Sequence, residues 1–218
     1  MTTQAMHIAQ GSSAQVRVGF LISYGGNELS SAIADFSKNH SEIELHTEFG
    51  THEELFNSLR SGHCDLVLND QRRAFSDEYV NHSLASFQAF IAVAEDSPLS
   101  ARAGICMNEL KQHPCILICP KDQMHIEEQF YRSVLNVEGE VLQAASITEG
   151  LMMVLSKQGF LMLDGCRLRQ STVPSIVYVP LTYEDGSAVR RNYCLFMRKD
   201  NNNESARLLL QSLATRLG

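Results

Sequence analysis

The chain has 218 residues, of which 44% are hydrophobic, and a formal net charge of −7, which is enough apolar material for one or two globular domains. An acidic surface without a basic stripe repels phosphate backbones, so the chain by itself is not expected to bind nucleic acid. No stretch is long and apolar enough to span a bilayer, so no membrane partner is expected.

Residues 1–15 are polar and rich in Ala, Ser and Gln, and they lack the charged and apolar regions of a signal peptide. We interpret them as a linker or tail. If Met1 is the native start, the protein is cytoplasmic.

The first part of the chain then alternates strand and helix. Strands are expected at 16–22, 43–49 and 66–70, with helices between them at 28–38 and 51–62. The second helix opens with a capping box, in which Thr51 and Glu54 exchange hydrogen bonds, and it stops at Gly62. This order predicts a βαβαβ unit of parallel strands joined by right-handed crossovers.

The same order returns further along the chain. Strands are expected at 115–119, 141–144 and 160–164, with helices at 123–135 and 146–159. The second of these helices opens with Ser146 and Glu149, again spaced as a capping box. In each unit the middle strand should lie at the sheet edge, in a 2-1-3 order.

Two extended stretches, 87–95 and 192–198, can join the two units, and a helix at 205–217 follows the second stretch. We therefore expect an α/β fold of two Rossmann-like lobes connected by two hinge strands. Lobe I would comprise 16–88 and 193–218, and lobe II 89–192. A ligand could then bind between lobes that move about the hinge.

The candidate binding residues follow the carboxyl ends of the expected strands, where open parallel sheets bind ligands. They are Ser23, Tyr24, Gly25, Thr51, Asn69 and Asp70 in lobe I, and Pro120, Lys121, Asp122 and Thr148 in lobe II. The alternative for Thr51, and for Ser146, is a purely structural helix cap. Ser23 lies in a glycine turn without a clear capping partner.

Arginine and lysine near these strand ends hint at an anionic ligand. Arg72 and Arg73 follow Asp70 directly, and Lys121 belongs to the other lobe. The alternative is that the arginines are solvated surface residues. His52 and His125 are further candidates for the cleft, although lone histidines usually have no such role.

No catalytic motif is present: the chain has no nucleophile elbow, P-loop, dinucleotide-binding glycine pattern or His-Glu-x-x-His sequence. We expect neither an enzyme nor a cofactor. The six cysteines lie mostly in or beside expected strands, where cysteine acts as a small hydrophobe. Cys115 and Cys119 flank an apolar strand, so no metal site is expected.

In their order along the chain, several segments resemble the effector-binding domain of LysR-type transcriptional regulators. They are Val16-Arg17-Val18-Gly19-Phe20, Ala34-Asp35-Phe36, Leu59 to Leu68, Phe90-Ile91-Ala92-Val93 and Ser97-Pro98-Leu99, followed by Glu109-Leu110 and His113 to Leu117. The resemblance covers residues 16–218. It implies a type 2 periplasmic-binding-protein-like fold and a cytoplasmic sensor of a small-molecule effector.

The resemblance also implies partners. In this family an amino-terminal winged helix binds DNA, and it is missing from this sequence, so DNA would be a partner only through that domain; residues 1–15 would be the remnant of its linker. The resemblance further implies an antiparallel homodimer with lobe I against lobe II of its mate, and tetramers are open for a full-length protein. We expect the dimer to bury Ala32, Phe36, Phe130 or their neighbours.

The peroxide-sensing branch of the LysR family pairs a cysteine in the loop after the first strand of lobe II with one in the next helix. This chain has Cys119 at the loop but no cysteine in the following helix. Disulfide sensing is therefore not expected, although oxidation of Cys119 alone remains open.

Two other functions share the fold. A solute-binding protein of a transporter would be distinguished by an export signal. An enzyme such as a dehydratase or deaminase would need an acid or base in the cleft, for which Asp70, Asp122, Asp164 and the histidines are the candidates.

Overall fold

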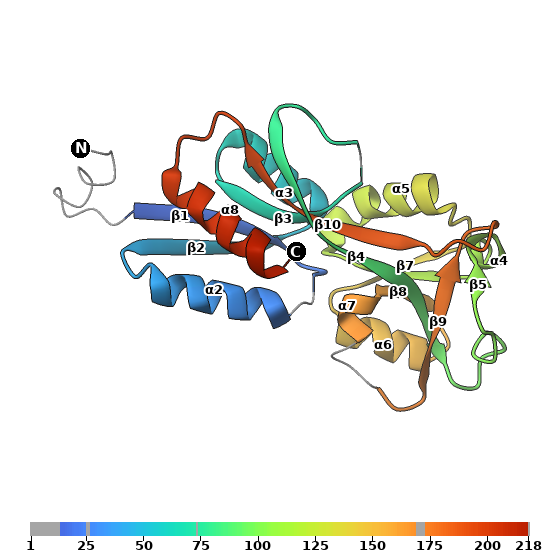
Figure 1. The fold of residues 1–218 in the computed structure, drawn as a ribbon. Coiled ribbons are helices and arrows are strands. Elements are labelled where there is room, and N and C mark those ends of the chain that lie inside the picture. The colour runs from blue at the N-terminus through green and yellow to red at the C-terminus, as the bar shows by residue number, and fades with distance from the viewer. Residues whose placement is uncertain (1–13, 25–26, 73, 169–172, 218) are drawn as a thin grey trace, which may run out of the picture. The chain divides into compact units, whose positions relative to one another are not determined.

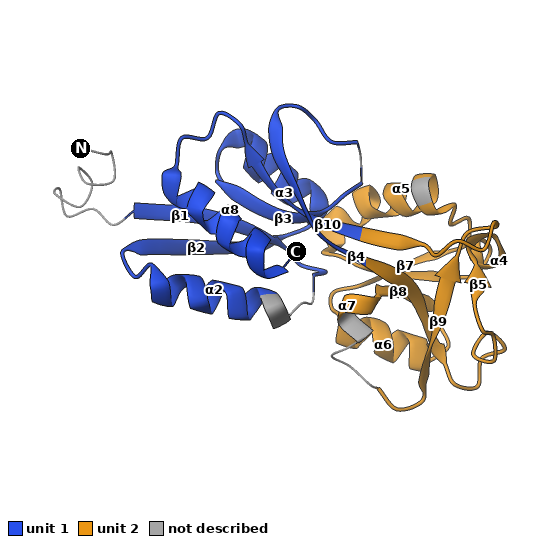
Figure 2. Cartoon of the chain, viewed as in Figure 1, with its two compact units in different colours: residues 1–86, 192–218 blue, residues 87–191 orange. Residues whose placement is uncertain are grey.

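The computed structural model describes residues 14–24, 27–72, 74–168 and 173–217. They form two compact units of strands and helices (Figures 1 and 2). The chain passes from unit 1 to unit 2 after Ser86 and returns after Arg191, so that unit 2 is the continuous segment Phe87–Arg191. Two strands carry the chain across these points: β4 (Tyr79–Ala94) and β10 (Arg190–Arg198).

The sheet of unit 1 is built on three parallel strands: β1 (Ala14–Leu21), β2 (Ile43–Gly50) and β3 (Leu66–Asp70). Strand β1 lies in the middle and pairs with β2 from Ala14↔Ile43 to Leu21↔Gly50, and with β3 on its other side. Strand β10 continues the sheet antiparallel to β3. The predicted 2-1-3 order is therefore confirmed, and β2 is an edge strand.

Three helices belong to unit 1: α2 (Asn27–Asn39), α3 (His52–Ser61) and α8 (Glu204–Leu217). The predicted capping box opens α3: the Thr51 N–H donates to Glu54 Oε2 at 2.7 Å, and the Glu54 N–H donates to Thr51 Oγ1 at 3.4 Å. The helix ends at Gly62, whose φ of 75° is left-handed backbone that glycine adopts without strain.

Helix α2 packs its apolar face against α8 within the same unit. Ala32 and Phe36 are each only 1% exposed. The expectation that a dimer axis buries these two residues is therefore wrong, because the core of unit 1 already covers them. The sequence pattern identified the apolar face correctly but could not show that α8, from the far end of the chain, packs against it.

Unit 2 repeats the arrangement with β6 (Cys115–Ile118), β7 (Val141–Ala144) and β8 (Phe160–Asp164). Strand β6 lies between β7 and β8 and is parallel to both, so the 2-1-3 order holds here too. Strand β8 lies antiparallel to β4. The longer helices of unit 2 are α5 (Met124–Leu135) and α6 (Ile147–Leu155).

Several elements of unit 2 did not stand out in the sequence. Strand β9 (Ile176–Thr182) pairs with both β4 and the short strand β5 (Ile105–Cys106). The helices α4 (Met107–Leu110) and α7 (Gly165–Leu168) are single turns. A 3-10 turn, η1 (Lys121–Gln123), precedes α5. Such short elements depend on tertiary contacts and carry little periodicity of their own.

The second capping box differs from its prediction. Ser146 accepts from the Glu149 N–H at 3.2 Å, but the Glu149 side chain accepts from Ala145 N and not from Ser146 N. Helix α6 also ends earlier than expected: its C-cap is Ser156, and Lys157 has a positive φ of 58°. The turn that leads to Gly159 and β8 is thus made before the glycine.

The cysteines are free thiols, and all except the partly exposed Cys106 are buried. This confirms that most of them serve as small core residues. None of the helices in the described part of the chain is long and apolar enough to cross a membrane.

Candidate functional site

Most candidate residues of unit 1 lie where its parallel strands end (Figure 1). Ser23 and Tyr24 follow β1, Thr51 follows β2, and Asn69 and Asp70 are the last residues of β3. Gly25 and Arg73 lie outside the described residues.

Asp70 forms the centre of a buried charged cluster. Its Oδ1 lies 2.7 Å from His52 Nδ1, and its Oδ2 accepts from Arg72 Nε at 3.1 Å. All three side chains are at least nine-tenths buried, with 3%, 8% and 7% of their surfaces exposed for Asp70, His52 and Arg72. Both oxygens of the carboxylate are therefore engaged within unit 1, and Asp70 holds the two basic side chains in place.

Asn69 ties the end of β3 to the start of α3. Its Nδ2 donates to the His52 carbonyl at 3.0 Å, and its Oδ1 accepts from the Asp70 N–H at 3.0 Å. Asn69, like Thr51, is buried and satisfies backbone groups. Thr51 thus caps α3, as the structural alternative for this residue predicted, and Asn69 joins β3 to α3.

An aromatic pair borders this cluster. The rings of Tyr24 and Tyr193 meet edge to face, with centroids 4.8 Å apart and planes at 69°. Tyr193 is fully buried and stands opposite Asp70 in the β3–β10 pairing. The sequence reading missed Tyr193, because nothing local to β10 reveals that it pairs with β3.

In unit 2 the candidates are more open. Lys121 and Asp122 are exposed residues of η1, which begins after Pro120, and Thr148 is exposed in the first turn of α6. The loop is held by Gln143, whose Nε2 donates to the Cys119 carbonyl at 2.7 Å. Their side chains remain accessible to a ligand, unlike those of Thr51 and Asn69. His125 is also exposed, on α5.

Cys119 lies at the same loop, and its surroundings disfavour a thiolate. Burial is the main reason that its pKa is raised to about 11, and the carboxylates of Glu127 and Asp122 add to the effect. Because the thiolate is the form that oxidants attack, this site does not favour peroxide sensing.

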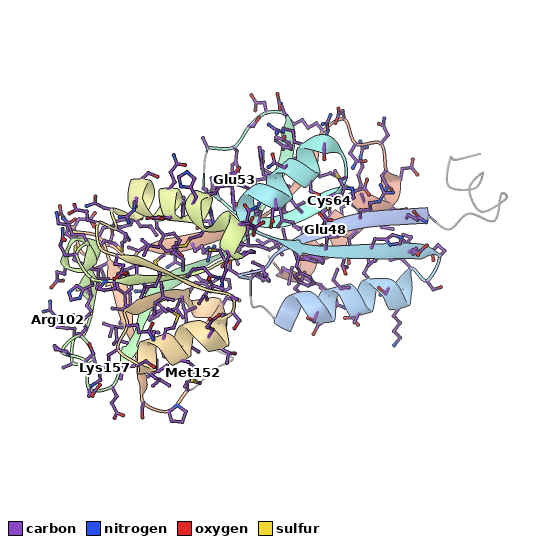
Figure 3. All side chains as sticks on the ribbon, turned by 180° about the vertical axis from the view of Figure 1, so that it is seen from behind. Glu48, Glu53, Cys64, Arg102, Met152 and Lys157 are labelled. Atoms are coloured by element: carbon purple, nitrogen blue, oxygen red, sulfur yellow. The ribbon has the colours of Figure 1, made fainter. Side chains whose placement is uncertain are left out.

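A second cluster of unit 1 joins Glu48 to Cys64 (Figure 3). Glu48 Oε1 accepts from Cys64 Sγ at 3.0 Å and from Ser58 Oγ at 2.6 Å, and Oε2 lies 3.3 Å from His63 Nε2. Burial opposes ionisation of Glu48, but these bonds outweigh it and leave its pKa lowered. Burial and Glu48 raise the pKa of Cys64 to about 12. The cluster fastens β2 to the end of α3, and no group of side chains in the described residues is suited to hold a metal.

Comparisons with known proteins agree on one family. The family model of the LysR substrate binding domain matches residues 9–218. The comparison with curated protein sequences gave no match.

Solved structures give the same fold. The effector-binding domain of BenM with its effector benzoate has a TM-score of 0.70 and 16% identity, covering 92% of this chain and 90% of that chain. The reduced OxyR regulatory domain from Pseudomonas aeruginosa has a TM-score of 0.69 and 17% identity, covering 93% of this chain and 98% of that chain. The MetR regulatory domain from N. meningitidis has a TM-score of 0.72 and 15% identity, covering 93% of both chains. The fold is thus the type 2 periplasmic-binding-protein-like fold, and the chain belongs to the family of LysR substrate-binding domains.

Proposed function

We propose that this chain is the sensing domain of a LysR-type transcription factor, which binds a small-molecule effector between its two lobes and thereby controls DNA-dependent transcription. The observation that carries the proposal is the cluster at the strand ends of unit 1, where a buried Arg72 is fixed by Asp70 beside the Tyr24–Tyr193 pair. Family membership supports a regulatory role, and benzoate is bound by the similar domain of BenM.

An anionic effector fits the basic side chains at the strand ends. Arg72, which follows β3, is held in unit 1 by a bond to its Nε, and Lys121 is exposed in the loop after β6 of unit 2. Guanidinium and ammonium groups both bind carboxylates well.

We propose further that the domain works in the cytoplasm. We also propose that it is not an enzyme and needs no cofactor. DNA would be a partner only through a winged helix outside this sequence.

A leucine in place of Ser23 should abolish effector binding, because it replaces a polar group at the end of β1 with a larger apolar one. We would screen small carboxylates, aromatics and amino acids by thermal shift. A ligand present at a hundred times its Kd stabilises the parent by about 2.7 kcal/mol. The control is Ser61→Leu, at the exposed end of α3. Binding of a confirmed effector by Ser23→Leu as tightly as by the parent would rule out this strand end as part of the site.

We also propose a homodimer, based on the two sheet edges. Strands β2 and β7 end the sheets of units 1 and 2, and exposed edge strands invite pairing or cover. Apolar side chains remain at these edges: Phe49 on β2 is 69% exposed, and Ile126 and Phe130 on α5 are not buried. An isologous dimer would cover both edges at once.

Aspartate in place of Phe130 should therefore give folded monomers, because a charge at a dimer interface must be desolvated without a partner. Light scattering at tens of micromolar measures the mass, and circular dichroism verifies the fold. Gln211→Asp, on the exposed side of α8, is the control and should remain dimeric. A parent that is already monomeric at this concentration contradicts the dimer.

A further inference from the structure

Unit 2 contains a pocket at the end opposite to its η1 loop. Three segments line it: β5 with α4, the end of α5, and the turn that joins β9 to β10 (Figure 1). Its volume is about 430 Å³, within the range of small-molecule sites, about 300–1,000 Å³. The 12 residues of α5 span about 18 Å, so Leu135 in the pocket lies far from Lys121 before the helix. The pocket is therefore separate from the candidate binding loop of unit 2.

Hydrogen bonds hold the walls of this pocket together. Cys106 pairs with Thr182 in the parallel β5–β9 ladder, and Thr182 Oγ1 donates to the Ile105 carbonyl at 3.3 Å. The turn after β9 is closed by the Tyr183 N–H, which donates to the Ser187 carbonyl at 2.8 Å. The pocket is thus preformed within unit 2 and does not depend on unit 1.

The interior of the pocket is apolar. Met107 is only 7% exposed and Leu135 is half-buried, and both line it. Tyr183 also lines the pocket, but it is 47% exposed. Aromatic rings contribute most when they are covered, so a ligand in the pocket would gain from contact with this ring.

Two carboxylates stand at the same pocket, directly after Tyr183. Glu184 accepts from Asn108 Nδ2, and Asp185 accepts from the Ser187 N–H at 2.8 Å and from its hydroxyl at 2.5 Å. All of these donors are neutral. In the part of the chain that the structure describes, neither carboxylate is paired with a basic side chain.

The basic residues that flank α4 do not compensate these charges. Arg102 pairs with Glu109, and Lys111 pairs with Glu138 at 3.3 Å. The bonds from Ser187 lower the pKa of Asp185, so this carboxyl is ionised at neutral pH. The pocket therefore combines an apolar interior with a negatively charged rim.

We propose that this pocket binds a small organic cation, namely a protonated amine with an apolar body. The apolar body covers Met107 and Leu135, and the ammonium lies against the Tyr183 ring and the Glu184 carboxylate. A metal ion fits less well, because the described residues include no group of His, Cys, Asp and Glu suited to hold one. The inference goes beyond the sensing function, since it gives the domain a second ligand of opposite charge.

The test uses benzylamine, which like lysine is protonated at pH 7, together with its neutral and anionic counterparts benzyl alcohol and benzoate. NMR of the protein with labelled methionine methyl groups follows Met107 in the pocket. Met152, which is 53% exposed on α6 outside the pocket, is the internal control. Titration of each compound gives its Kd at the pocket.

The variants separate the charge from the ring. Glu184→Gln removes one charge and keeps an acceptor for Asn108. Its matched control is Glu140→Gln, which makes the same change at an exposed glutamate of unit 2 outside the pocket. Tyr183→Leu removes the ring but keeps an apolar side chain, whereas Tyr183→Phe keeps the ring.

We expect benzylamine to shift the Met107 signal to saturation without shifting that of Met152, and to bind about tenfold more tightly than benzyl alcohol or benzoate. Glu184→Gln and Tyr183→Leu should each weaken benzylamine by about three- to fivefold. Tyr183→Phe and Glu140→Gln should bind like the parent.

Three results would overturn the inference: no shift of Met107 with benzylamine, equally tight binding of benzyl alcohol, or an unchanged affinity of Glu184→Gln for benzylamine. The first two are measured on the parent protein, so they decide the matter even if a variant does not fold. The sensing function is tested separately, with Ser23→Leu.

Discussion

Replacing Asp70 by alanine is expected to lower the free energy of unfolding by about 3–5 kcal/mol. The substitution removes the carboxylate that accepts from both His52 and Arg72, and all three side chains are at least nine-tenths buried. The guanidinium would be left without this counter-charge in a place that excludes water. Urea unfolding followed by circular dichroism measures the loss.

Two further variants make this result specific. Asp77→Ala removes an exposed aspartate of the same unit and should change stability by less than about 0.5 kcal/mol. Asp70→Asn keeps an acceptor for one partner, so its loss in the free energy of unfolding should lie between those of Asp70→Ala and Asp77→Ala. If Asp70→Ala were as stable as Asp77→Ala, the buried ion pairs of Asp70 would not stabilise the fold.

Replacing Phe36 by aspartate is expected to unfold the protein instead of producing a folded monomer. Phe36 lies on α2, which packs against α8, and it is only 1% exposed. Loss of a buried phenylalanine costs about 3–5 kcal/mol, and an unpaired buried carboxylate adds to it. The total approaches the whole stability of an ordinary domain, about 5–15 kcal/mol.

The matched control is Phe75→Asp, which introduces the same charge at a phenylalanine that is 46% exposed in the same unit. Phe75 contacts the ring of Phe196, so a loss of only about 1 kcal/mol is expected. Calorimetry and light scattering together separate unfolding from dissociation. A folded, monomeric Phe36→Asp variant would instead indicate that Phe36 lies in a dimer interface.

The sequence by itself determined the repeated βαβαβ order, the 2-1-3 arrangement of each sheet and the start of α3 at Thr51. These features have local causes: apolar periodicity, a capping box and the crossover that parallel strands require. The ordered series of segments was also enough to indicate the LysR family, since the resemblance does not depend on a single motif. The burial of most cysteines also has a local cause, because they lie in or beside apolar strands.

Only the tertiary structure decided which candidate side chains are available. The sequence placed Asn69, Asp70 and Thr51 correctly at strand ends, but their hydrogen bonds run to α3, Arg72 and Glu54. It gave His52 little weight and missed Tyr193, whose place depends on β10 joining β3 from a distance of more than a hundred residues. The burial of Phe36 likewise depends on α8. Pairings between segments far apart in the chain leave no local pattern, and it is these pairings that fix which polar groups are already satisfied.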